Sequence, residues 1–71
     1  MMKKHSVTIR GHRTSFSLES EFWTELKTIA HRRQKTLAQL VTSIDERRGK
    51  EENLSSALRL YVLHQVKHPT D

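Results

Sequence analysis

The sequence predicts a small, mostly α-helical protein with one short β-ribbon, which a second copy of the chain completes. Residues 13–18 (RTSFSL) alternate between polar and apolar side chains, and three amphipathic segments follow them. The chain has 71 residues and no cysteine, so it is one domain without disulfides. A monomer of this size buries only a marginal core, and a symmetric dimer is the commonest remedy.

The alternating strand has one apolar and one polar face. Phe16 and Leu18 point to one side, because side chains along a strand alternate with period two. Arg13, Ser15 and Ser17 point to the other side. A single strand leaves its backbone hydrogen-bonding groups without partners, so it needs a second strand. The simplest source is the same strand of a second chain, which predicts an antiparallel two-stranded sheet between subunits.

The first twelve residues are expected to form a basic N-terminal arm that includes a short strand. Met1–His5 has the composition of a disordered basic terminus, and Ser6–Ile9 alternates like a strand. The apolar residues Val7 and Ile9 occupy odd positions, whereas those of the ribbon strand occupy even positions. A straight strand would place the two pairs on opposite faces, so the chain must bend or turn at residues 10–12. A hairpin and a kinked arm both satisfy this requirement.

The first two helices are predicted over residues 19–33 and 36–48. The first has a single apolar stripe, with acidic residues near its start and basic residues at its end. This stripe consists of Phe22, Trp23, Leu26, Ile29 and Ala30. The second opens with Thr36-Leu37-Ala38-Gln39, a capping box in which the threonine and glutamine side chains bind free backbone donors.

A third helix is predicted over residues 53–67, with Asn53 as its N-terminal cap. Apolar residues occupy most of its circumference, which is typical of a helix that is buried or contacted from two directions. His64 and His68 are spaced like metal ligands, but no third ligand is indicated, and we expect no metal.

The charge distribution favours a polyanionic partner. The formal net charge is +5, residues 1–13 contain no acid, and Arg32, Arg33 and Lys35 form a second basic group. Lys3, Lys4 and Arg10 either reach DNA phosphates or form a solvated charged tail. The sequence has no membrane span, signal peptide or catalytic motif, so we expect a cytoplasmic protein that is not an enzyme and has no cofactor.

The order and spacing of these segments resemble the ribbon-helix-helix family of DNA-binding proteins, to which the Arc and MetJ repressors belong. The resemblance rests on the ribbon strand at residues 13–18, the first helix start at 19–23 and the capped second helix start at 36–39. Residues 13–48 correspond to the core of the family, and the helix at 53–67 is an addition to it. Further runs, among them residues 6–9 and 53–59, are similar to a group of small bacterial ribbon-helix-helix proteins.

The resemblance implies an intertwined homodimer that binds double-stranded DNA and regulates transcription. In this family the ribbon lies in the major groove, where Arg13, Ser15 and Ser17 would face the bases. The start of the second helix anchors a phosphate, which would involve Lys35 and the backbone of Thr36 and Leu37. A helix N-terminus suits this role because its free N–H groups attract anions.

One alternative comes from a different functional class. The chain would then be a homodimeric protein-interaction module, such as an adaptor or an antitoxin-like protein, with weak or no DNA binding. The apolar character of residues 53–66 motivates this alternative, because that segment would hold the protein partner.

Overall fold

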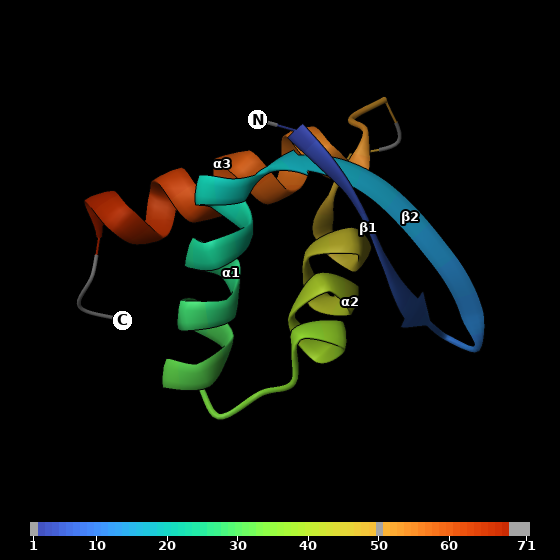
Figure 1. Cartoon of the computed structure of the whole chain (residues 1–71), viewed down its shortest axis with the longest axis horizontal. Helices are drawn as coiled ribbons and strands as arrows, with labels where there is room; N and C mark the ends of the chain where they lie inside the picture. The colour runs from blue at the N-terminus through green and yellow to red at the C-terminus, as the bar shows by residue number, and fades with distance from the viewer. Residues whose placement is uncertain (1, 50, 69–71) are drawn as a thin grey trace.

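A computed structural model describes residues 2–49 and 51–68 of the chain. It consists of a two-stranded antiparallel sheet followed by three helices, which confirms the predicted fold class (Figure 1). The elements are β1 (Met2–Ile9), β2 (His12–Glu19), α1 (Ser20–Arg32), α2 (Leu37–Arg47) and α3 (Leu54–Lys67).

The two strands form a hairpin within one chain, which differs from the predicted pairing between subunits. The connection is the dipeptide Arg10-Gly11, whose φ angles are 53° and 81°. Two central residues with positive φ are the requirement of a type I′ turn, whose twist matches that of the flanking strands. Of the two paths that the sequence allows at residues 10–12, a hairpin or a kinked arm, the structure therefore has the hairpin. Met2–His5 also lies in β1, so the disordered arm expected there is not observed.

The hairpin register explains the odd and even apolar patterns of the two strands. Every facing pair joins an odd position to an even one; His5, for example, lies opposite Phe16, and Lys3 lies opposite Leu18. The odd positions of β1 and the even positions of β2 therefore share one face. This face carries the half-buried Val7 and the buried Ile9, and the helices cover it.

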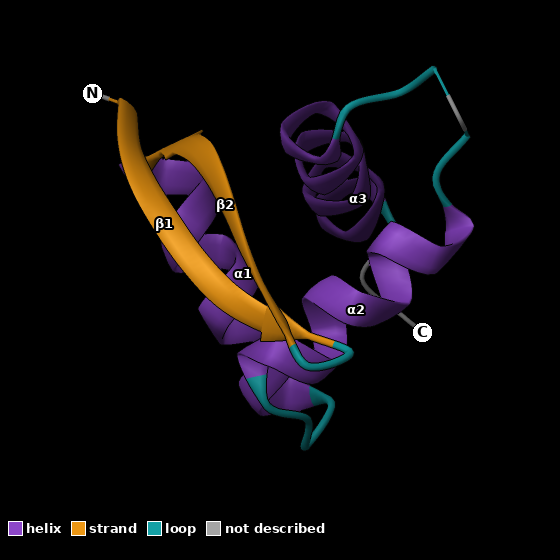
Figure 2. Ribbon diagram, turned by 90° about the vertical axis from the view of Figure 1, so that its right-hand side faces the viewer, coloured by secondary structure: helices purple, strands orange, loops and turns teal. Residues whose placement is uncertain are grey.

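The core lies between the hairpin and the helices. Figure 2 shows the hairpin as an outer layer on one side of the molecule, with the helices on its inner side. Leu18, Leu26 and Leu58, from three different elements, are fully shielded from solvent. The other buried apolar residues are Ile9, Phe16, Ile29, Ala30, Leu40, Val41, Ile44, Leu54, Ala57 and Val62.

Side-chain caps begin both later helices, as the sequence predicted. At α2 the hydroxyl of Thr36 accepts from the Gln39 N–H at 3.0 Å, and the Gln39 side-chain oxygen accepts from the Thr36 N–H at 2.8 Å. At α3 the side-chain oxygen of Asn53 accepts from the Ser56 N–H at 2.8 Å. These bonds replace water at donors that a helix leaves unpaired, and so they define where each helix starts.

Two polar contacts fasten α3 to the end of β2. The Ser55 hydroxyl donates to the Ser17 carbonyl at 2.8 Å, and Arg59 forms an ion pair with Glu19 at 2.9 Å. The hydrogen bond from Arg59 is the main reason that the pKa of the Glu19 carboxyl lies below its ordinary value. The helix that the sequence suggests as an addition is thus joined directly to the ribbon.

The turn geometry predicts unequal effects of the same substitution at two glycines. Gly11→Ala places a side chain at a positive φ, although nothing lies within 4 Å of the added Cβ. We expect the free energy of unfolding to fall by about 1 kcal/mol in urea titrations. Gly49→Ala is the control, because its Cβ also meets nothing within 4 Å and its φ is not in the positive range. Equal losses in the two variants would contradict the type I′ turn.

Candidate nucleic-acid interface

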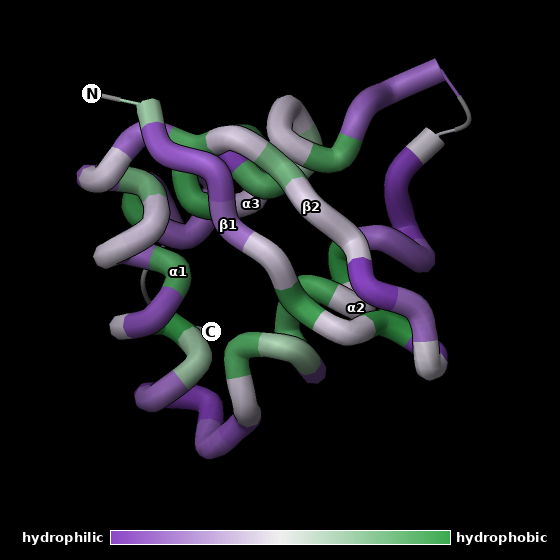
Figure 3. The backbone as a smooth tube through the Cα atoms, turned by 45° about the vertical axis from the view of Figure 1, so that its right-hand side comes forward, coloured by the Kyte–Doolittle hydropathy of each residue, from purple (hydrophilic) through white to green (hydrophobic). Residues whose placement is uncertain are grey.

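The outer face of the ribbon carries six exposed polar side chains, three from each strand. The sequence predicted the three on β2, which are Arg13, Ser15 and Ser17. The hairpin adds Lys4, Ser6 and Thr8 from β1 to the same face. Figure 3 shows strongly hydrophilic segments in the N-terminal part of β1 and at the turn end of the hairpin.

Cross-strand pairing brings the two triplets together. Lys4 lies opposite Ser17, Ser6 opposite Ser15, and Thr8 opposite Arg13. The hydroxyl oxygens of Ser6 and Ser15 are 3.3 Å apart, which places them within hydrogen-bond distance. The sequence did not assign Ser6 and Thr8 to this face. The signal that would have done so is the two-residue turn, which makes even positions of β1 face odd positions of β2.

This outer face has the chemistry of a surface that reads DNA. Its six exposed polar side chains include two cations and no acid, and Glu19, which ends the same face of β2, is paired with Arg59. A two-stranded ribbon fits the major groove, where an arginine can donate two bonds to a guanine edge. Hydroxyl groups donate or accept, so Ser15 and Ser17 can contact several bases but discriminate less between them.

Arg10 lies at the turn and contacts α2. Its guanidinium forms an ion pair with Glu46 at 2.8 Å, and both side chains are more than half exposed. The pair is solvated, so its energetic contribution is small. It still balances the charge of Arg10 with an acid, which sets this residue apart from the cations of the outer face.

The N-terminus of α2 offers backbone donors next to a lysine. The capping box occupies the N–H groups of Thr36 and Gln39. Within the described part of the chain, the N–H groups of Leu37 and Ala38 have no hydrogen-bond partner. Lys35 is exposed directly before the helix. The free donors of the predicted phosphate site are thus those of Leu37 and Ala38, because the Thr36 N–H is already bonded.

An aromatic cluster on the inner face supports the ribbon. The His5 ring stacks on Trp23 of α1, with centroids 3.7 Å apart and planes 8° from parallel. Phe16 packs at 6.1 Å from both rings. Burial lowers the pKa of His5 below its ordinary value, and the charges of Lys3 and Lys27 lower it further. No hydrogen-bond partner of the buried His5 Nε2 atom is present in the described residues.

Residues 2–49 and 51–68 contain neither a cluster of metal ligands nor a membrane-spanning helix. No group of three or more histidine, aspartate or glutamate side chains there is arranged to hold a metal ion. The rings of His64 and His68 lie 4.6 Å apart without a third ligand. None of the helices in this part of the chain is long and apolar enough to cross a membrane.

The position of His5 predicts a pH dependence of stability. A histidine whose folded-state pKa is lowered stabilises the fold when neutral, above its unfolded pKa of about 6.5. This contribution is lost as the pH falls through the lower folded-state pKa. Urea titrations at pH 8.0 and 5.5 should therefore show a smaller unfolding free energy at pH 5.5. His5→Phe should reduce that difference, and a variant with the same difference as the wild type would rule out His5 as its source.

The comparison with known families agrees with this geometry. A family model of the ribbon-helix-helix domain matches residues 2–66, which include both strands and nearly all of the three helices. No curated protein and no solved structure gives a significant match. The family match covers most of the chain, and it includes the hairpin and α3 as well as the predicted core. The chain therefore belongs to the ribbon-helix-helix domain family.

Proposed function

We propose that this protein binds double-stranded DNA through the outer face of its β1–β2 ribbon and regulates transcription in the cytoplasm. The observation that carries the proposal is the exposed part of the outer face, where Lys4, Arg13 and four hydroxyl side chains lie together; the acid at its end, Glu19, is paired with Arg59. Ribbon-helix-helix domains are generally DNA-binding transcription regulators, which supports the same function.

The proposed contacts divide into two kinds. Arg13, with Ser15 and Ser17, faces the base edges in the major groove, where side chains distinguish sequences. Lys35 and the free N–H groups of Leu37 and Ala38 hold a phosphate, which positions the protein without reading bases. Much of the affinity then comes from phosphates, so it should fall steeply as the salt concentration rises.

We also propose that the functional unit on DNA is a homodimer. Ribbon-helix-helix domains typically bind DNA as dimers. Two chains related by a twofold axis would recognise two half-sites, so the preferred DNA sequence would be close to a palindrome. Sedimentation of the protein with and without duplex DNA measures this directly, and a single chain bound per duplex would contradict it.

A second candidate function is protein binding through α3. Its outer side exposes Leu60, Leu63 and Val66, each with more than half of its surface accessible. Contiguous exposed apolar residues often mark an interaction surface. In this alternative the protein is an interaction module, and its ribbon contributes little to DNA binding.

The base-reading role of Arg13 can be tested by substitution. We expect Arg13→Ala to weaken binding to a selected duplex by about 1–3 kcal/mol and to relax the sequence preference at one position. Fluorescence anisotropy with the selected duplex and its single-base variants measures both effects. Lys67→Ala removes one exposed charge at the far end of α3 and serves as the control. A similar loss in both variants would point to general electrostatic attraction.

The phosphate-binding role of Lys35 predicts a different pattern. Lys35→Ala should weaken binding to about the same extent for every duplex, because a phosphate contact carries no sequence information. The slope of log affinity against log salt concentration should decrease by about 1. An unchanged salt slope would show that Lys35 does not contact the DNA backbone.

A further inference from the structure

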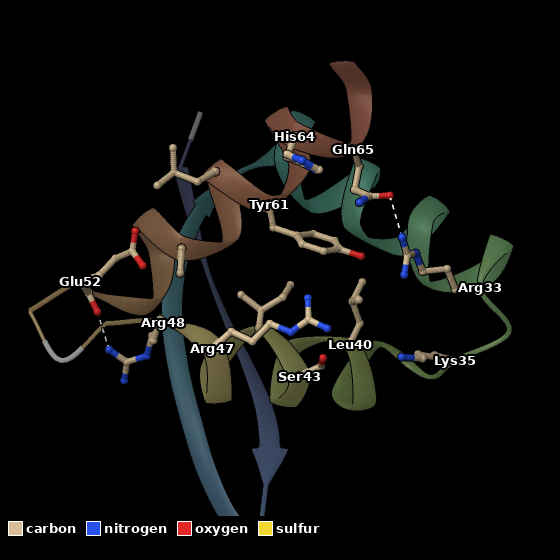
Figure 4. A pocket seen from close by; sticks show the side chains of 13 residues that line it. Arg33, Lys35, Leu40, Ser43, Arg47, Arg48, Glu52, Tyr61, His64 and Gln65 are labelled. Carbon is tan, nitrogen blue, oxygen red and sulfur yellow. Dashed lines mark hydrogen bonds between the residues drawn. The ribbon is translucent and has the colours of Figure 1, made fainter. Parts of the chain in front are cut away.

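A groove on the side of α2 and α3 has properties that DNA binding does not explain. Its volume is about 600 Å³, which lies within the range of small-molecule sites (Figure 4). The apolar part of its lining comes from both helices and consists of Leu40, Ile44, Ala57, Leu60 and the ring of Tyr61. A surface of this kind can hold a hydrocarbon chain or an aromatic ring.

Cations surround this apolar part of the groove. Arg33, Lys35, Arg47 and Arg48 line it, whereas Glu52 is its only acidic lining residue in the described part of the chain. Arg48 is bound to the carboxylate of Asp45 at 2.6 Å, so its charge is balanced locally. Arg47 and Lys35 are exposed, and neither side chain has a hydrogen-bond or ion-pair partner among the described residues. The charges of Arg47 and Lys35 are therefore not neutralised by any other described residue of the chain.

The hydroxyl of Tyr61 adds a directed donor to the groove. This oxygen is buried and has no hydrogen-bond partner within the described residues. In Figure 4 the guanidinium groups of Arg47 and Arg33 lie on either side of it. The Arg33 group is oriented by a hydrogen bond of 3.1 Å to the side-chain oxygen of Gln65. Buried polar groups are nearly always paired, so an acceptor bound between these residues would supply the hydrogen-bond partner that the Tyr61 hydroxyl lacks.

We propose that this groove binds a small amphipathic carboxylate, such as a medium-chain aliphatic acid or an arylalkanoic acid. The carboxylate accepts hydrogen bonds from Arg47 and from the Tyr61 hydroxyl, and Lys35 and Arg33 add favourable charge. The apolar part of the ligand lies on Leu40 and Leu60. The site is separate from the outer face of the ribbon and shares only Lys35 with the proposed phosphate site, so the inference holds whether or not the ribbon binds DNA.

Charge complementarity favours this ligand over a second copy of the chain. In a twofold contact the same patch meets itself, so the positive rims of two grooves would be brought together. Four cations and a single acid line this patch in the described part of the chain, so such a contact would add repulsion. A carboxylate instead neutralises the charge of Arg47 and also supplies the acceptor that Tyr61 lacks.

The direct test is isothermal titration calorimetry of the full-length protein with sodium octanoate and with 4-phenylbutyrate. We expect saturable binding of one ligand per chain, and no comparable binding of octylammonium, which has the opposite charge. Arg47→Gln should weaken octanoate binding by about tenfold, because a hydrogen bond to a charged group is lost. Tyr61→Phe keeps the ring and should weaken binding by about fivefold. Equal affinity for octanoate and octylammonium would overturn the proposal.

Two leucines on α3 provide a matched pair of variants. Leu60 lines the groove and Leu63 does not, yet their exposed fractions are 53% and 52%. We expect Leu60→Gln to weaken octanoate binding, whereas Leu63→Gln should leave it unchanged; circular dichroism checks that both variants fold. Equal losses would indicate general adsorption to α3 and contradict a defined site. Sedimentation of the Leu60→Gln variant tests whether a second copy of the chain fills the groove instead. Conversion of a dimer to a monomer would show that it does and would overturn the proposal.

Discussion

The two-stranded ribbon has one apolar face that must be covered, and the rest of the fold follows from this constraint. An isolated hairpin is at best marginally stable in water, so its inner face has to pack against other elements. Here Phe16 and Leu18 are buried beneath the ribbon, and His5 stacks on Trp23 of α1. The helices leave the outer face free. The same arrangement that stabilises the ribbon thus makes its polar side available to a ligand.

The third helix has two roles that follow from its two sides. One side is buried through Leu58 and Val62 and is tied to the ribbon through Ser55 and Arg59. The other side forms a wall of the groove against α2. The molecule therefore has two cationic surfaces with different chemistry. The ribbon combines positive charge with hydroxyl groups, which suits base edges and phosphates, whereas the groove combines it with apolar side chains, which suits an amphipathic anion.

Much of the fold could be predicted from the sequence because it depends on local rules. Alternation assigned Arg13 and Ser15 to an exposed face, and cap residues located the starts of α2 and α3. The partner of β2 was not predicted correctly, because alternation defines the faces of a strand and not the strand beside it. The turn also has an arginine at a position where asparagine is usual. Arg10 adopts a positive φ, which is uncommon for arginine, so the turn was difficult to predict. The groove depends on how α2 and α3 pack, which no local pattern encodes.

The two-residue turn also determines how this chain can change in length over evolution. Substitution at the turn alters its strain, but insertion or deletion of one residue changes which positions face each other. If β2 kept its place on the core, such a shift would turn Val7 and Ile9 outward and bring Ser6 and Thr8 against the helices. Insertions of two residues would preserve the faces. Homologues that retain this hairpin should therefore vary in turn length by even numbers, even where the turn residues themselves differ.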